Sequence, residues 1–132
     1  MFAWVDDLAC YPRWLDIVPS ADPAPAHPDD PGPAWFVTLR AKMGPLARAK
    51  RLRMVRTEHV APTRAVFERA EHDGKDHATW RLSATVTETA DGSSLQMALL
   101  YSGSLWVPLL DRVLTHEIEG SRPRLLALIH SA

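Results

Sequence analysis

The chain has 132 residues, of which 46% are hydrophobic and 23% are charged, and its formal net charge is −1. This composition is typical of one folded domain, residues 1–132, and excludes a disordered chain. A net charge so close to zero argues against long-range attraction to nucleic acid or to an anionic membrane, so neither is an expected partner.

Cysteine content and the N-terminus bear on the cellular compartment. Cys10 is the single cysteine, so an internal disulfide is excluded. No apolar run approaches the length of about 20 residues that crosses a bilayer. The first ten residues carry Asp6 and Asp7 and no basic leader, so we expect no signal peptide. A cytoplasmic location is therefore the expectation.

The N-terminal third predicts two short helices and a loop. Residues 2–8 read as a helical fragment, and Tyr11–Val18 reads as a second short helix that Pro12 opens. Residues 19–33 contain six prolines, which exclude a helix or a central strand. We expect this stretch to be a loop, and loops of this length are often mobile or functional.

The middle of the chain changes to the two-residue period of β-strands. Two Asp-Gly pairs, at 73–74 and 91–92, are hairpin turn signals between alternating runs. We therefore predict a consecutive antiparallel meander. The predicted strands cover residues 35–40, 47–59, 64–71, 77–89 and 95–103.

The last segment returns to helical spacing and predicts a long amphipathic helix. Because Pro123 interrupts it, a kink or break is expected near residues 120–123. The residues that fall near one stripe of this helix are Leu110, Val113, Leu114, Glu117, Ile118, Ser121, Leu125 and Leu128.

Three stretches of the chain resemble the START-like (SRPBCC) superfamily, in its polyketide cyclase/dehydrase and lipid transport branch. Residues 7–15, with Tyr11-Pro12-Arg13-Trp14, look like its paired short helices; residues 95–101 look like its last strand, and residues 109–128 like its closing helix. The resemblance implies an α+β helix-grip fold. In that fold a curved antiparallel sheet of about six strands wraps around a long C-terminal helix.

One departure from this family pattern concerns the N-terminus. Family members usually begin with a strand before the first helix, and this chain begins inside what resembles that helix. A missing strand leaves neighbouring backbone groups unpaired. We therefore expect either that the native start lies upstream of Met1 or that a second chain covers the open edge, giving a homodimer.

The predicted function is binding of a small hydrophobic or amphipathic ligand between the sheet and the C-terminal helix. Methionine and aromatic side chains adapt to varied apolar shapes, and the Tyr101 hydroxyl is the leading polar contact. The predicted lining residues are Trp35, Val37, Leu39, Met54, Phe67, Arg69, Trp80, Leu82, Met97, Leu99, Tyr101, Leu110 and Leu114.

Charged residues on the predicted strands leave alternatives open. Arg69 either reaches the cavity, where it needs a carboxylate such as Glu117 or one on the ligand, or lies at the rim. The dense basic run is either a solvated outer face or a source of one arginine that pairs with a ligand anion. This run contains Arg48, Lys50, Arg51, Arg53 and Arg56.

Local motifs for catalysis, cofactors and metals are missing. His116-Glu117 lacks the second histidine of a zinc-binding pair, and His72 and His77 offer only two ligands, so no metal is predicted. Neither a phosphate-binding glycine loop nor a serine nucleophile motif occurs, and no cofactor is expected. A polyketide cyclase/aromatase-like enzyme is one alternative function, and a non-catalytic interaction module with a filled core is another.

Overall fold

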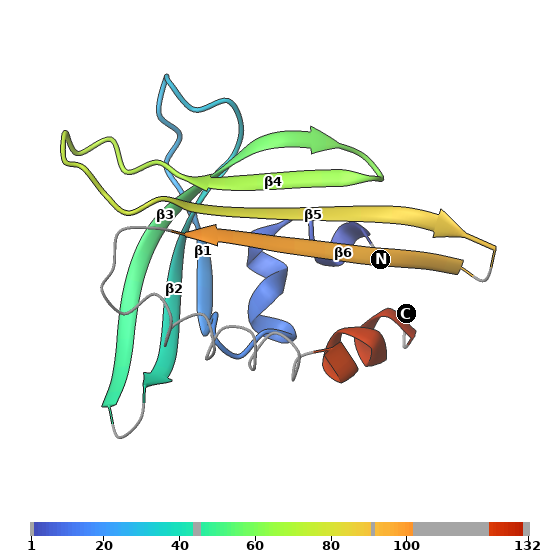
Figure 1. The fold of residues 1–132 in the computed structure, drawn as a ribbon. Helices are drawn as coiled ribbons and strands as arrows, with labels where there is room; N and C mark the ends of the chain where they lie inside the picture. Colours follow the sequence, from blue (N-terminus) through green and yellow to red (C-terminus); the bar gives the residue numbers. More distant parts are fainter. Residues whose placement is uncertain (1, 44–45, 91, 102–121, 131–132) are drawn as a thin grey trace.

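A computed structural model of the protein describes residues 2–43, 46–90, 92–101 and 122–130. Two 3-10 helices come first and a six-stranded antiparallel sheet follows (Figure 1). The elements are η1 (Phe2–Trp4), η2 (Leu8–Arg13), β1 (Ser20–Ala24), β2 (Ala34–Met43), β3 (Leu46–Val60), β4 (Arg64–Arg69), β5 (Trp80–Thr89) and β6 (Gly92–Tyr101).

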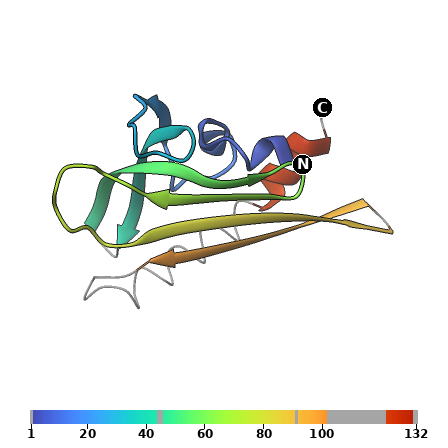
Figure 2. The same cartoon turned by 90° about the horizontal axis from the view of Figure 1, so that it is seen from above.

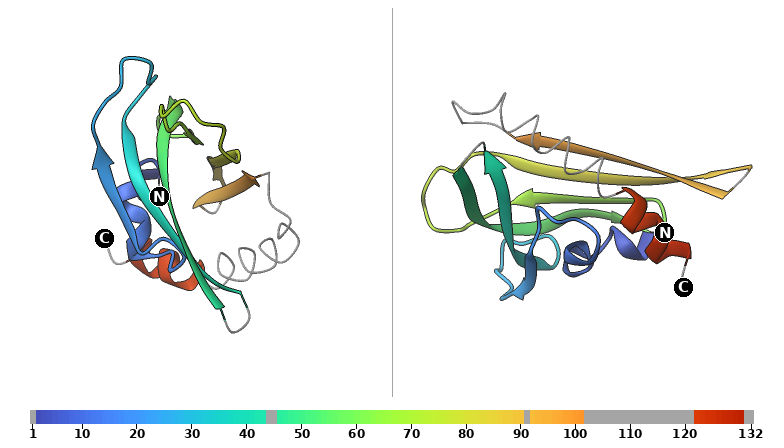
Figure 3. Two further views of the ribbon diagram at one scale, coloured as in Figure 1. Left: turned by 90° about the vertical axis from the view of Figure 1, so that its left-hand side faces the viewer. Right: turned by 90° about the horizontal axis from the view of Figure 1, so that it is seen from below.

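The predicted antiparallel meander is confirmed. Its strand order is β1-β2-β3-β4-β5-β6, so every strand pairs with its neighbour in sequence. Views from two further sides show that the sheet is curved (Figure 3). Such curvature agrees with a register shift in the long strand β3 between Arg56 and Glu58, because a bulge bends a strand.

The predicted turn at Asp73-Gly74 is wrong in length. Residues 70–79 separate β4 from β5, so the connection is a ten-residue loop (79 − 70 + 1 = 10) and not a tight hairpin. Gly74 has φ +73°, a left-handed backbone that glycine adopts without strain. Glycine there serves a turn inside the longer loop. At the next hairpin Thr89 pairs with Gly92, so Gly92 already belongs to β6.

The prediction that residues 19–33 form only a loop is also wrong. Ser20–Ala24 form β1, and Pro23 is opposite Trp35 of β2. Because β1 lies at the edge of the sheet, Pro23 can face the side that needs no N–H donor, which explains a proline in a strand. One edge of β2 is therefore paired with β1 of the same chain.

Both N-terminal helices are shorter than predicted. The helix expected over Tyr11–Val18 is replaced by η2, which contains Pro12 and ends at Arg13. Asp7 caps η2 because its carboxylate accepts a hydrogen bond from the Ala9 N–H at 2.9 Å. A 3-10 helix this short has few interior hydrogen bonds. It accommodates Pro12 because the missing N–H of proline removes little.

These two helices pack on one face of the sheet, here called the inner face. Tyr11 lies 4.9 Å from Trp14 and 6.3 Å from Phe67 between ring centroids, and Trp35 lies 5.7 Å from Phe67. The Tyr11 hydroxyl donates to the Val5 carbonyl at 2.9 Å, and burial raises the Tyr11 pKa well above its usual range. The core is thus built from N-terminal rings laid against strand side chains.

A helix over residues 122–130 lies near the N-terminal helices (Figure 2). Leu125 is buried in the core, and Arg124 forms an ion pair with Asp16. Pro123 lies within this helical stretch, and the kink or break expected near residues 120–123 falls partly outside the described residues. No helix in the described residues is both long and apolar enough to cross a membrane. Leu110 and Leu114 lie outside those residues, so the helix-grip arrangement stays a prediction.

Candidate functional site

The sheet places the predicted cavity residues of β2 to β6 on the inner face. Residues that are paired across neighbouring strands point to the same side of a sheet. Met54 is opposite both Trp35 and Arg69, and Leu82 is opposite both Phe67 and Leu99. Val37 and Leu39 follow Trp35 at the two-residue spacing, and Trp80 is opposite Tyr101. Whether these residues bind a ligand stays a prediction, but they do share one surface.

The inner face is not uniformly covered. Its β2–β4 half is tightly packed, with Trp35, Val37, Leu52, Met54 and Phe67 all between 0% and 6% exposed. In the β5–β6 half a row of apolar side chains is only half-buried, although it packs against the same core. This row, here called the open row, consists of Leu82, Leu95, Met97, Leu99 and Tyr101.

Trp80 lies at the boundary between the open row and the β4–β5 loop. Its ring stacks on Tyr101 with centroids 5.2 Å apart and 21° between the planes. Trp80 is 7% exposed, and its buried Nε1–H has no hydrogen-bond partner among the described residues. A buried donor without an acceptor costs about 1–3 kcal/mol, so this atom is a natural position for an acceptor from a bound molecule or a water.

Arg69 lies on the inner face at the end of β4, and its charge is balanced by Glu71. The Arg69 Nε–H donates to the Glu71 carboxylate at 2.9 Å, and the Arg69 side chain is only 8% exposed. The carboxylate partner that burial requires is therefore Glu71, in place of the predicted Glu117, which lies outside the described residues. Lys50 shares this face, and burial, with the nearby Arg69 charge, lowers the Lys50 pKa.

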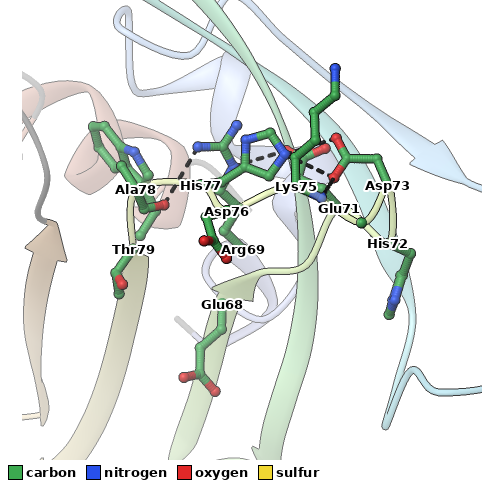
Figure 4. A pocket seen from close by; sticks show the side chains of 12 residues that line it. Glu68, Arg69, Glu71, His72, Asp73, Lys75, Asp76, His77, Ala78 and Thr79 are labelled. Atoms are coloured by element: carbon green, nitrogen blue, oxygen red, sulfur yellow. Dashed lines mark hydrogen bonds and ion pairs between the residues drawn. The ribbon is translucent and has the colours of Figure 1, made fainter.

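The β4–β5 loop lines a polar pocket of about 460 Å³ that is open to solvent on one side (Figure 4). Arg69 and Trp80 line it at the ends of β4 and β5, and the loop residues between them complete it. In Figure 4 the Arg69 guanidinium points toward the Ala78 carbonyl, which it meets at 3.4 Å. His77 pairs with Asp73 at 2.8 Å, so both groups of this candidate acid–base pair are engaged with each other.

A second charged cluster lies on the opposite face and was missed by sequence reasoning. Arg53 is buried and forms a two-pronged ion pair with Asp30, at 3.1 Å and 2.6 Å. The Asp30 side chain is 3% exposed. The hydrogen bonds from Arg53 hold the pKa of Asp30 well below its usual range, although burial opposes them. Arg53 is therefore not part of a solvated outer face, whereas Arg51 lies exposed over the Phe36 ring.

This ion pair fastens the segment between β1 and β2 to the rest of the sheet. Arg53 also donates to the carbonyls of Pro25 and Ala70, at 2.9 Å and 3.0 Å. Asp30 in turn accepts from the His27 backbone N–H at 2.9 Å. The segment between β1 and β2, which the sequence predicted as part of a loop, thus has a buried anchor at Asp30.

Two histidines meet beside this anchor. The His27 and His72 rings stack with centroids 3.8 Å apart and 6° between planes. His72 also contacts Asp30 through Nε2 at 2.8 Å. His72 and His77, which the sequence offered as two possible ligands, instead contact different carboxylates, Asp30 and Asp73. No local signal points to His27, which is 45 residues away from His72 (72 − 27 = 45).

Comparison with known proteins does not place the chain in a family. None of the protein-family models, curated proteins or solved structures searched matches it. The resemblance to START-like proteins thus remains an expectation drawn from the sequence pattern, and the function is argued below from the residues themselves.

Proposed function

We propose that this protein binds a small hydrophobic or amphipathic molecule on the open row of the inner face. Support comes from the five half-buried apolar residues of that row, which continue a fully packed core. Burial of apolar surface of this kind contributes a favourable free energy of about 25 cal/mol for each Å² removed from water. A ligand that lies along the row removes that surface from solvent.

The observation that carries the proposal is the buried Trp80 Nε1–H without a described partner, directly beside the open row. Ligand pockets are lined mainly by apolar side chains, with a few polar groups that fix orientation. An amphipathic ligand with a carbonyl, carboxylate or ether oxygen at one end satisfies this donor while its apolar part covers the row. Arg69 and Lys50 make that end of the face positive, and Glu71 neutralises part of this charge.

The first test is native mass spectrometry of protein purified without detergent, which detects a co-purified small molecule. The second test is fluorescence titration with 11-(dansylamino)undecanoic acid, an amphipathic probe with a carboxylate. Leu99→Gln removes an apolar contact from the open row and is expected to weaken probe binding about tenfold, which corresponds to about 1.4 kcal/mol.

The chain offers a matched control on the same strand. Leu100 is 60% exposed and points to the opposite face, so Leu100→Gln should leave the probe affinity unchanged. Trp80→Phe keeps an aromatic ring but removes the Nε1–H donor. A several-fold loss of probe affinity is expected, because a hydrogen bond contributes about 1 kcal/mol. Equal probe affinities for Leu99→Gln and Leu100→Gln, or no probe binding to the wild type, contradict the proposal.

A further inference from the structure

We propose that His27, Asp29 and His72 form a binding site for Zn²⁺ on the face of the sheet opposite the open row. Each of these residues offers one ligand atom, and the three atoms lie within 4.8 Å of one another. His27 and Asp29 belong to the segment between β1 and β2, whereas His72 belongs to the β4–β5 loop. A bound ion would therefore join two connections that are distant in sequence.

The hydrogen bonds around His72 leave one ring nitrogen ready for a metal. Asp30 is held as a carboxylate by the ion pair with Arg53, and a carboxylate only accepts hydrogen bonds. The contact between His72 Nε2 and Asp30 at 2.8 Å therefore places the ring proton on Nε2, and in the neutral ring Nδ1 keeps its lone pair. Zinc-binding histidines usually donate their other N–H to a carboxylate in this way.

His27 is poised in the same tautomer by an independent contact. Its Nδ1 accepts a hydrogen bond from the Asp29 backbone N–H at 3.0 Å, so Nδ1 carries the lone pair, and Zn²⁺ would replace this N–H donor at Nδ1 on binding. The Asp29 carboxylate lies 3.8 Å from the same nitrogen, and the Asp29 side chain is 80% exposed. Three protein ligands, two of them imidazoles, form a set that suits Zn²⁺ better than Mg²⁺ or Ca²⁺ and leaves one coordination position to water.

Binding requires one ring to leave the stack. An imidazole lone pair lies in the plane of its ring, so two parallel rings 3.8 Å apart cannot both direct a lone pair at one ion. His27 is the ring that can tilt, because Asp29 supplies its only side-chain hydrogen bond among the described residues. His72 is instead held by buried Asp30. Zn²⁺ has no geometric preference from its d electrons, which favours it over Cu²⁺ at such an irregular site.

The test is isothermal titration of untagged, chelator-treated protein with ZnCl₂, and with MgCl₂ as a comparison. We expect one equivalent of Zn²⁺ to bind and no Mg²⁺. His27→Gln and His72→Asn should each weaken Zn²⁺ binding by at least about tenfold, and Asp29→Asn should weaken it less. His72→Asn is chosen because His72 has φ +56°, a backbone conformation that asparagine tolerates.

The matched control is His77→Gln, which removes a histidine from another histidine–carboxylate pair of the same loop. It should leave Zn²⁺ affinity unchanged. Long-range ¹H–¹⁵N spectra of the histidine rings should show Nδ1 of His27 and His72 shifting on addition of Zn²⁺, with no shift at His77.

Three results overturn the proposal: no saturable Zn²⁺ binding, unchanged affinity in both His27→Gln and His72→Asn, or an equal loss in His77→Gln. Circular dichroism shows whether each variant is folded. His27→Gln alone decides the question if His72→Asn unfolds.

Discussion

The two halves of the inner face differ in how the chain covers them. In the β2–β4 half, Tyr11 and Trp14 pack against strand residues such as Phe67, and all three are 0–2% exposed. In the β5–β6 half, Met97 and Leu99 have the same apolar character but remain half-buried. One continuous sheet thus has a half that its own N-terminal segment fills and a half that retains accessible apolar surface.

This difference separates residues needed for stability from residues available for binding. Side chains of the filled half already have their contacts, so changing them should alter folding. Side chains of the open row are only half-buried, so changing them should alter binding more than folding. The three predictions that follow test this division.

The largest loss of stability is expected at the ion pair between Arg53 and Asp30, on the face of the sheet opposite the filled half. Asp30→Asn removes the carboxylate that is paired with the buried Arg53 guanidinium, and breaking a buried pair in this way typically costs about 3–5 kcal/mol. Urea denaturation at neutral pH in chelator-treated protein measures this loss. Asp16→Asn is the control, because it breaks an exposed ion pair with Arg124, and such pairs contribute about 1 kcal/mol or less. Equal losses in the two variants would show that the Asp30 pair is not an anchor.

A matched pair of leucines tests the two halves directly. Leu52 is 1% exposed in the filled half, and Leu52→Ala should lower the free energy of unfolding by about 3 kcal/mol through lost burial and a cavity. Leu99 is half-buried in the open row, and Leu99→Ala should cost about 1 kcal/mol. The same denaturation experiment compares them. A cost for Leu99→Ala as large as that for Leu52→Ala would remove the distinction.

The third prediction concerns how the free energy of unfolding depends on pH through Asp30, a dependence that is small near neutral pH and grows in acid. Its pKa is lower in the folded protein than in the unfolded chain, so the unfolded state takes up the proton first as pH falls. The stability from ionised Asp30 is therefore complete near neutral pH and declines progressively below about pH 5. Asp30→Asn should flatten this decline, whereas Leu52→Ala should shift the curve without changing its slope. Unfolding measured against pH distinguishes the two, and parallel curves for wild type and Asp30→Asn would contradict the assignment.

The strands were predictable because they rest on a local pattern. Alternation of apolar and polar residues located β2 to β6 and placed Trp35, Met54 and Phe67 on one face. Strand β1 was missed because its prolines mask a pattern that an edge position tolerates. Local pattern therefore predicted the central strands and the edge strand β6, and it failed at the proline-containing edge strand β1.

The charged contacts could not be predicted from the sequence. Arg53 and Asp30 are 23 residues apart and come from a regular strand and an irregular segment. Nothing in the spacing distinguishes Arg53 from the neighbouring basic residues of β3. The partner of Arg69 was left open between Glu117, a ligand carboxylate and a rim position, and the contact with Glu71, two residues beyond the end of β4, was not foreseen.

The agreement between strand order and chain order has a consequence for how the protein folds. Since each strand pairs with the one before it, hairpins can form one after another along the chain. No strand pairs with a partner that is distant in sequence. The longest connections between paired strands in the described residues are the segments 25–33 and 70–79. The entropic cost of closing each loop is therefore small. The sheet can therefore form by adding one strand at a time, from the first hairpin toward β6.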